Sequence, residues 1–207
     1  DDPRQANRLK VVHLNELKGG AAATAHLLAF DSVQGRWRAN ISANETGDAI
    51  RINESSLGFS SHAAPADIPW GDLGVELVLE CTGKFLTPET LQGHFDRGAK
   101  RVLVSAPVKQ GNVLNVVVGV NEHLYDPAKD RIVTAASCTT NCLAPVVKVV
   151  HENLGIRHGQ ITPIHNPTNT NLVVEASHHD LRTARSALIS PRSVPSCVLW
   201  SLPAFPS

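Results

Sequence analysis

Residues 135–143 read AASCTTNCL and stand where the hydrophobic pattern of the chain changes. An apolar run over 131–136 leads into this polar cluster, and apolar residues then recur at spacings of three and four as far as Leu154. Gly155 follows, where helices commonly end. The pattern predicts a strand, a turn, and a helix that begins at or just after Cys138.

Cys138 is the candidate nucleophile of this turn. Backbone N–H groups and the dipole at a helix N-terminus favour an anion, which makes a thiolate accessible near neutral pH. The alternative is a buried structural cysteine beside capping residues. Capping needs one small polar residue, whereas four surround this cysteine: Ser137, Thr139, Thr140 and Asn141. The surplus favours a polar site.

Apolar runs alternate with helical patterns upstream of the turn. Strands are predicted over 9–14, 36–41, 49–52, 75–80, 101–105 and 114–120, and helices over 21–30 and 87–98. This alternation predicts an α/β fold with a parallel sheet, whose ligands bind at the carboxyl ends of the strands. Polar residues fall at such ends, at 15–16, 81–83, 105–107 and 137–141. We therefore expect this half of the chain to build a site, with Cys81 a buried strand-end cysteine.

The string at 135–143 resembles, almost letter for letter, the active-site signature of the glyceraldehyde-3-phosphate dehydrogenase family. The resemblance extends from Arg8 to Ser190. The wording HLNELKG at 13–19, AHLLAFDS at 25–32 and ARSALIS at 184–190 looks most like the bacterial branch associated with arsenate resistance. The resemblance implies an NAD-binding domain followed by a catalytic domain.

The resemblance also implies roles for individual residues. Cys138 would be the nucleophile, and His165, at the end of a strand predicted over 159–165, the catalytic base. The hydroxyls that hold the substrate phosphate and the attacking anion would be those of Ser137, Thr139, Thr168 and Thr170. The cofactor would contact Asn15, Glu16, Thr82, Gly83 and Ser105.

The roles of Glu16 and His165 each have an alternative that sequence position alone does not exclude. Glu16 ends a strand where an acidic residue accepts hydrogen bonds from the adenosine ribose, but a solvated glutamate fits that position equally well. The chain has ten histidines, so the spacing of His165 from Cys138 is weak evidence by itself. Other histidines are interpreted as surface or hydrogen-bonded structural residues: His13, His26, His94, His178 and His179.

The implied reaction is the NAD-dependent oxidative phosphorylation of glyceraldehyde 3-phosphate through a cysteine thioester. Inorganic phosphate or arsenate would be the acceptor, and NADP is not excluded as the cofactor. The intact family is expected to be a cytoplasmic homotetramer. Nineteen basic residues balance nineteen acidic ones, which gives no attraction to nucleic acid or anionic membranes. No apolar run is long enough to insert into a membrane, and the four cysteines lack the CxxC spacing of a metal site.

The expected organisation is an NAD-binding domain over 1–137, the start of an α+β catalytic domain over 138–190, and an unrelated, disordered tail over 191–207. The chain contains no G-x-G-x-x-G turn and no Met. We therefore expect a truncated, doubly wound Rossmann-type sheet that lacks its first β-α unit. Two other interpretations stay open: a catalytically inactive fragment or pseudogene product, and a redox-sensing or binding module that uses Cys138.

Overall fold

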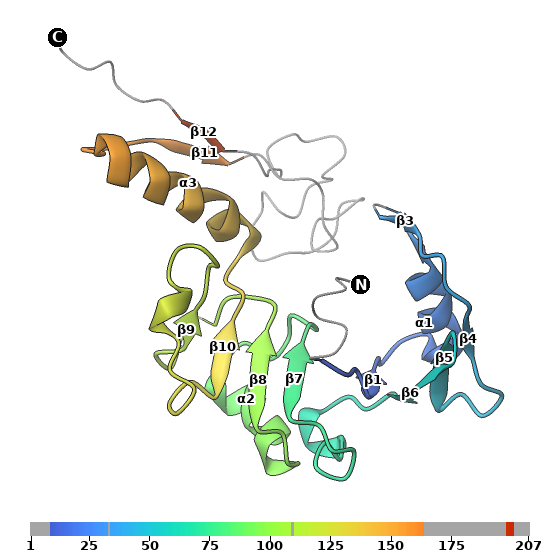
Figure 1. Ribbon diagram of the computed structural model, residues 1–207. Coiled ribbons are helices and arrows are strands. Elements are labelled where there is room, and N and C mark those ends of the chain that lie inside the picture. Colours follow the sequence, from blue (N-terminus) through green and yellow to red (C-terminus); the bar gives the residue numbers. More distant parts are fainter. Residues whose placement is uncertain (1–8, 33, 109, 164–197, 201–207) are drawn as a thin grey trace, which may run out of the picture. The chain divides into compact units, whose positions relative to one another are not determined.

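The computed structural model describes residues 9–32, 34–108, 110–163 and 198–200 (Figure 1). The chain divides into two compact units. Unit 1 comprises the chain up to Val104 together with 108–113 and 127–133. Unit 2 comprises 105–107, 114–126 and the chain from Thr134 onward.

The first sheet of unit 1 has the strand order β1-β6-β5-β4. β1 runs parallel to β6, with His13 opposite Gly58, whereas β4, β5 and β6 are antiparallel to one another. The strands are β1 (His13–Asn15), β4 (Ile41–Ala43), β5 (Ala49–Ile52) and β6 (Ser55–Ser60). A separate antiparallel hairpin consists of β2 (Phe30–Asp31) and β3 (Gly35–Arg36).

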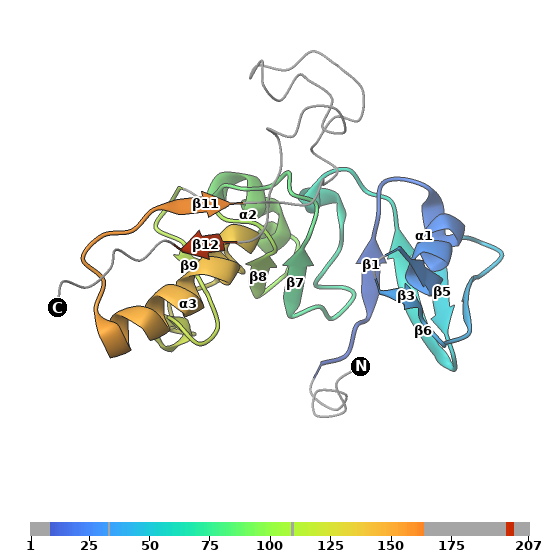
Figure 2. The same cartoon turned by 90° about the horizontal axis from the view of Figure 1, so that it is seen from above.

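Helix α1 (Gly20–Ala29) packs against this first sheet (Figures 1 and 2). Its two buried alanines, Ala21 and Ala25, form a core with Ile50 and Phe59 of the sheet. Because alanine side chains are short, the helix axis comes close to the strands, and the larger sheet side chains fill the space between.

The second sheet has the order β7-β8-β10-β9. Its strands are β7 (Leu77–Glu80), β8 (Arg101–Val104), β9 (Leu114–Asn115) and β10 (Ile132–Thr134). β7 and β8 are parallel and are joined by α2 (Pro88–Asp96). Thr87 caps α2 through a reciprocal pair of bonds with Thr90, as expected for a helix that begins with proline. This β-α-β unit and the parallel β1-β6 pair confirm the α/β fold class.

Two glycines allow α2 to approach the segment that precedes β7. A Cβ on Gly93 would lie 2.9 Å from the backbone nitrogen of Ala66, in the short helix η1 (Pro65–Asp67). Gly98 has a φ of +100°, and a Cβ there would lie 2.6 Å from Cα of Gly71. Larger residues at 93 or 98 would therefore force the helix away from the segment that carries Trp70.

Some sequence-based predictions differ from the structure. The strand predicted over 114–120 ends at Asn115, because the side chain of Asn121 accepts from the N–H of Val117 (2.7 Å) and donates to the carbonyl of Asn115 (2.9 Å), which turns the chain. The short helix η2 (Glu122–Leu124) follows. Cys81, predicted to be buried, is exposed, because the chain leaves the sheet directly after Glu80.

In unit 2, α3 (Cys138–Leu154) ends at Gly155, as predicted. β11 (Ile161–Pro163) pairs antiparallel with β12 (Val198–Trp200), with Ile161 opposite Trp200. Within the tail predicted to be disordered, residues 198–200 thus form a strand, in keeping with the strand preference of β-branched and aromatic residues. Among the described residues, no helix combines the length and apolar character needed to cross a membrane.

Candidate active site

Thr134, at the end of β10, holds the turn that leads into α3. It is fully buried at 0% exposure. Its carbonyl accepts from the N–H of Val116 (2.8 Å), and its hydroxyl donates to Oδ1 of Asn115 (2.7 Å) and accepts from the N–H of Ala136 (3.0 Å). Ala136 has a φ of +55°, a left-handed conformation that is uncommon for alanine. These bonds fix the direction in which the chain reaches Cys138.

Small polar residues then start the helix. The hydroxyl of Ser137 accepts from the N–H of Thr140 (3.0 Å) and lies 2.8 Å from the Thr140 hydroxyl. The amide of Asn141 donates to the carbonyls of Ala135 (2.7 Å) and Ser137 (2.9 Å). Ser137, Thr140 and Asn141, which favoured a site in the sequence, are therefore engaged in building the turn itself.

Cys138 is the first residue of α3, and its side chain is a free, exposed thiol. Cys142, one turn later, is also free and exposed. The position of Cys138 places its sulfur at the positive end of the helix dipole. A thiol in this position is accessible to an electrophilic carbonyl and can act as a nucleophile.

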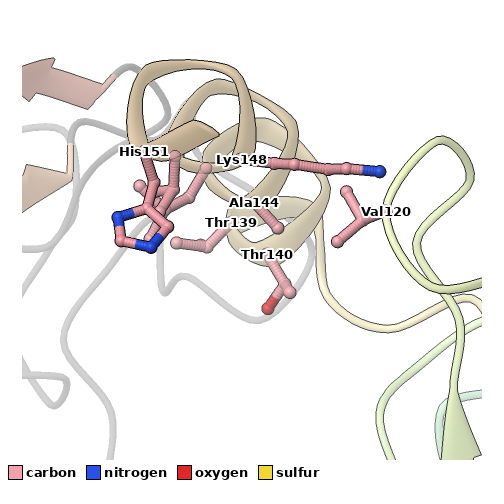
Figure 3. A pocket seen from close by; sticks show the side chains of 8 residues that line it. Val120, Thr139, Thr140, Ala144, Lys148 and His151 are labelled. Carbon is pink, nitrogen blue, oxygen red and sulfur yellow. The ribbon is translucent and has the colours of Figure 1, made fainter. Parts of the chain in front are cut away.

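An open, largely apolar hollow of about 390 Å³ lies along one side of α3 (Figure 3). Lys148 extends from this part of the helix, and its ammonium donates to the carbonyl of Gly119 (2.9 Å). This bond ties the middle of α3 to the loop that contains Val120. The lining residues are Val120, Thr139, Thr140, Leu143, Ala144, Val147, Lys148 and His151. Of the two predicted anion-binding residues that the structure describes, Ser137 and Thr139, Thr139 lines this hollow. Cys138 does not line it.

In unit 1, Asn15 and Glu16 lie at the carboxyl end of β1. The amide of Asn15 accepts from the Ser60 hydroxyl (2.9 Å) and the N–H of His62 (2.8 Å), and it donates to the His62 carbonyl (3.0 Å). Asn15 thus joins the ends of β1 and β6. The Glu16 carboxylate is exposed and accepts from the N–H of Lys18 (3.1 Å), so it faces solvent at the position predicted for the ribose.

Thr82 and Gly83 follow β7. Both the N–H (2.7 Å) and the hydroxyl of Thr82 donate to one carboxylate oxygen of Glu80. Gly83 has a φ of +68°, and a Cβ there would meet no atom within 4 Å, so the backbone is open on that side. Ser105 directly follows β8 and is exposed.

The remaining predicted site residues, His165, Thr168 and Thr170, lie outside the described residues, so their roles stay predictions. Within the part of the chain that the structure describes, no group of three or more His, Cys, Asp or Glu side chains is arranged to hold a metal ion.

Sequence reasoning missed a buried hydrogen-bonded chain in unit 1. The indole N–H of Trp70 donates to Nδ1 of His94 (3.0 Å), and Nε2 of His94 lies 3.2 Å from Oε2 of Glu80. His94 and Glu80 are only 2% and 4% exposed. The interpretation of His94 as structural is confirmed. The available signal for Glu80 was a charged residue closing an apolar strand, and its partners are distant in sequence.

Hydrogen bonds determine the ionisation of Glu80. Burial raises the pKa of this carboxyl, but the hydrogen bonds from His94 and Thr82 together lower it by more. The pKa therefore lies below the ordinary glutamate value, and the side chain is a carboxylate at neutral pH.

Parallel strands with polar residues at their carboxyl ends, in a β-α-β arrangement, define a Rossmann-type nucleotide-binding domain. Models of two protein-family domains match consecutive parts of the chain. One is the glyceraldehyde 3-phosphate dehydrogenase NAD binding domain at residues 3–88, and the other is the C-terminal domain of the same enzyme at residues 137–196. The chain belongs to the glyceraldehyde-3-phosphate dehydrogenase family.

Curated relatives agree with this placement. Glyceraldehyde-3-phosphate dehydrogenase 3 of Nostoc sp. is 57% identical over 182 residues, which is 88% of this chain and 53% of the relative. The plasmid enzyme of Cupriavidus necator is 44% identical over 182 residues, with the same shares. The enzyme of Geobacillus stearothermophilus is 41% identical over 179 residues, 86% of this chain and 52% of the relative. The chain spans about half the length of the curated relatives it matches.

Proposed function

We propose that this chain carries the NAD-binding domain and the catalytic cysteine of a phosphorylating glyceraldehyde-3-phosphate dehydrogenase. The observation that carries the proposal is the position of Cys138, a free and exposed thiol on the first residue of α3. The turn before it is held by the buried Thr134, and Ser137 caps the N-terminus of α3. Family membership supports the same role for this cysteine.

In the proposed reaction, the Cys138 thiolate adds to the aldehyde carbon of glyceraldehyde 3-phosphate and forms a C–S bond. The carbonyl π bond breaks, and its oxygen takes up the proton that the Cys138 thiol gave to His165. His165 removes that proton again as the carbonyl re-forms, and the hydrogen on carbon leaves as a hydride. NAD supplies the hydride acceptor. Inorganic phosphate then attacks the thioester, the C–S bond breaks, and an acyl phosphate leaves with the Cys138 thiolate restored.

The strand ends of the nucleotide-binding domain fit the cofactor. Glu16 presents an exposed carboxylate after β1, which suits the ribose hydroxyls of NAD and repels the 2′-phosphate of NADP. Gly83 leaves open space above the backbone after β7. We assign Asn15 a supporting role, because its amide is engaged with Ser60 and His62.

The acceptor anion is a second part of the proposal. The hydroxyls of Ser137, Thr139, Thr168 and Thr170 would hold the substrate phosphate and the attacking anion. Phosphate and arsenate are nearly isosteric, and the resemblance to the branch associated with arsenate resistance supports arsenate as an acceptor alongside phosphate. Attack by arsenate would give the unstable 1-arseno-3-phosphoglycerate, so replacing phosphate by arsenate should preserve NAD reduction.

The test measures NAD reduction by the purified chain with glyceraldehyde 3-phosphate and phosphate. Cys138→Ser should lower the rate by at least about a thousandfold, because a hydroxyl is a far poorer nucleophile than a thiolate. Cys142→Ser is the matched control, an exposed thiol one turn along the same helix, and should keep the wild-type rate. Equal rates for Cys138→Ser and the wild type, or no NAD reduction by the wild type, would contradict the proposal.

A further inference from the structure

The hydrogen-bonded chain in unit 1 reaches from a buried indole to the strand end that we assign to the cofactor. It runs from Trp70 through His94 and Glu80 to Thr82. The first three side chains are buried, whereas Thr82 is exposed. This hydrogen-bonded chain therefore connects three buried side chains to a residue at the surface.

The donors along this chain determine the form of His94. Because the indole of Trp70 can only donate, Nδ1 of His94 must accept, and the single hydrogen of a neutral imidazole then lies on Nε2. Nε2 faces Oε2 of Glu80, which accepts that hydrogen. The hydrogen bonds are therefore donated in one direction only, from Trp70 to His94 and from His94 to Glu80.

Glu80 is fully engaged by these partners. One carboxylate oxygen accepts from His94, and the other accepts both donors of Thr82. A buried carboxylate requires such donors, because it has left the water that would otherwise solvate it. The Thr82 backbone is consequently held by a group that has no alternative partner among the described residues.

Aromatic rings pack closely around His94 and restrict the movement of the hydrogen-bonded side chains. The rings of Trp70 and Phe85 lie 5.9 and 6.4 Å from the His94 ring, centroid to centroid. The ring of His13 lies 6.0 Å from that of Trp70. Gly98 brings the end of α2 against Gly71, next to Trp70 in sequence, which fixes the helix that carries His94.

We infer that Trp70, His94 and Glu80 are positioning residues for the nucleotide site: through Glu80 they fix Thr82, and with it the backbone of Gly83, in the conformation that receives the cofactor. This inference rests on the proposed function, which places NAD at the 82–83 segment. Fixing the segment before binding removes the ordering cost that a mobile loop would impose on NAD affinity.

Glu80→Gln interrupts this hydrogen-bonded chain and leaves the shape of the side chain at position 80 almost unchanged. If the glutamine oxygen faces His94, its NH₂ group faces the N–H of Thr82. If the oxygen faces Thr82, the NH₂ group faces the hydrogen on Nε2 of His94. Moving that hydrogen to Nδ1 would set it against the indole N–H of Trp70. Two donors oppose each other in every arrangement, so we expect NAD to bind about tenfold more weakly.

Trp70→Phe offers a specific rescue of this defect. It keeps a ring of similar shape and removes the indole N–H, so that His94 can carry its hydrogen on Nδ1 and accept from the glutamine. The double variant should therefore bind NAD more tightly than the product of the two single effects predicts. Trp37→Phe is the matched control, a partly exposed tryptophan in the same unit, and should neither weaken binding nor rescue Glu80→Gln.

The experiment is a titration with NAD, monitored by isothermal calorimetry, of the wild-type chain, the three single variants, and the two double variants that combine Glu80→Gln with Trp70→Phe or with Trp37→Phe. Wild-type affinity in Glu80→Gln, or purely multiplicative effects in the double variant with Trp70→Phe, would overturn the inference and leave the proposed function standing. No NAD binding by the wild type would overturn the proposed function, and this inference with it.

A second measurement covers the case in which Glu80→Gln does not fold. Hydrogen exchange at the Thr82 amide should accelerate in Trp70→Phe and stay at the wild-type rate in Trp37→Phe. Equal exchange rates in the two variants would overturn the inference.

Discussion

Two strand ends of this molecule are built on opposite principles. At the end of β7, a buried carboxylate collects hydrogen bonds from His94 and Thr82. At the start of α3, hydroxyls, an amide and backbone carbonyls form the turn, and the side chain of Cys138 stays exposed. A buried charge tolerates no missing partner, whereas an exposed cap can exchange its bonds with water. The first design suits a residue that positions others, and the second suits one that meets a substrate.

Removing the buried carboxylate should have the largest effect on stability. Glu80→Ala leaves His94 and Thr82 without their acceptor in the interior, and we expect the free energy of unfolding to fall by about 3–5 kcal/mol. Denaturant unfolding followed by circular dichroism measures this change. The control is Glu76→Ala, which removes the exposed partner of Lys100 and should leave stability nearly unchanged. Similar losses in the two variants would show that burial of Glu80 has no special cost.

Acid should lower stability by less than Glu80→Ala does, because protonation keeps the Glu80 side chain and removes only its charge. The pKa of Glu80 is lowered in the folded chain. Its contribution to stability is therefore fully present above the ordinary glutamate pKa and is lost as the pH falls through the lowered value. As the pH is lowered, the free energy of unfolding should therefore fall less steeply in Glu80→Gln than in the wild type. Other carboxyl groups with a lowered pKa, which keep part of the slope, are Asp48, Glu76, Glu89 and Glu122. Identical slopes would contradict the assignment.

The exposed turn should respond most weakly. Ser137→Ala removes the acceptor for the N–H of Thr140, and we expect a loss of about 1 kcal/mol in the free energy of unfolding. Thermal unfolding compared with Ser42→Ala, an exposed serine on β4, isolates the capping contribution. A loss as large as that of Glu80→Ala would remove the contrast between the two strand ends.

Local patterns were sufficient to predict the helices and several strands. α2 begins with a Thr-Pro capping signal, and α3 ends at a glycine, so the predicted bounds of both helices are close to the observed ones. β6 was missed, because its Ser-Ser-Leu-Gly-Phe-Ser sequence is typical of turns. Its pairing with β1 and β5 supplies the strand geometry, and such long-range pairing leaves no local signal.

The candidate site shows the same division. The position of Cys138 at the start of a helix followed from its neighbours in sequence. The burial of Glu80 did not, because its partners Trp70 and His94 come from other elements and meet it only in the folded chain. Ser137 was predicted to bind an anion, and that role is untested. Its observed bonds show that a residue suited to ligand binding is equally suited to capping a helix.

The most direct test of the central claim is to locate the covalent intermediate by mass spectrometry. The chain is incubated with glyceraldehyde 3-phosphate and NAD without phosphate, so that the thioester accumulates, and is then digested with trypsin. Cys138 and Cys142 share the peptide between Arg131 and Lys148, so the experiment uses the Cys142→Ser variant. We predict an acyl adduct on Cys138 in this variant and no adduct after Cys138→Ser. An adduct on Cys81, or none on any cysteine, would contradict the account.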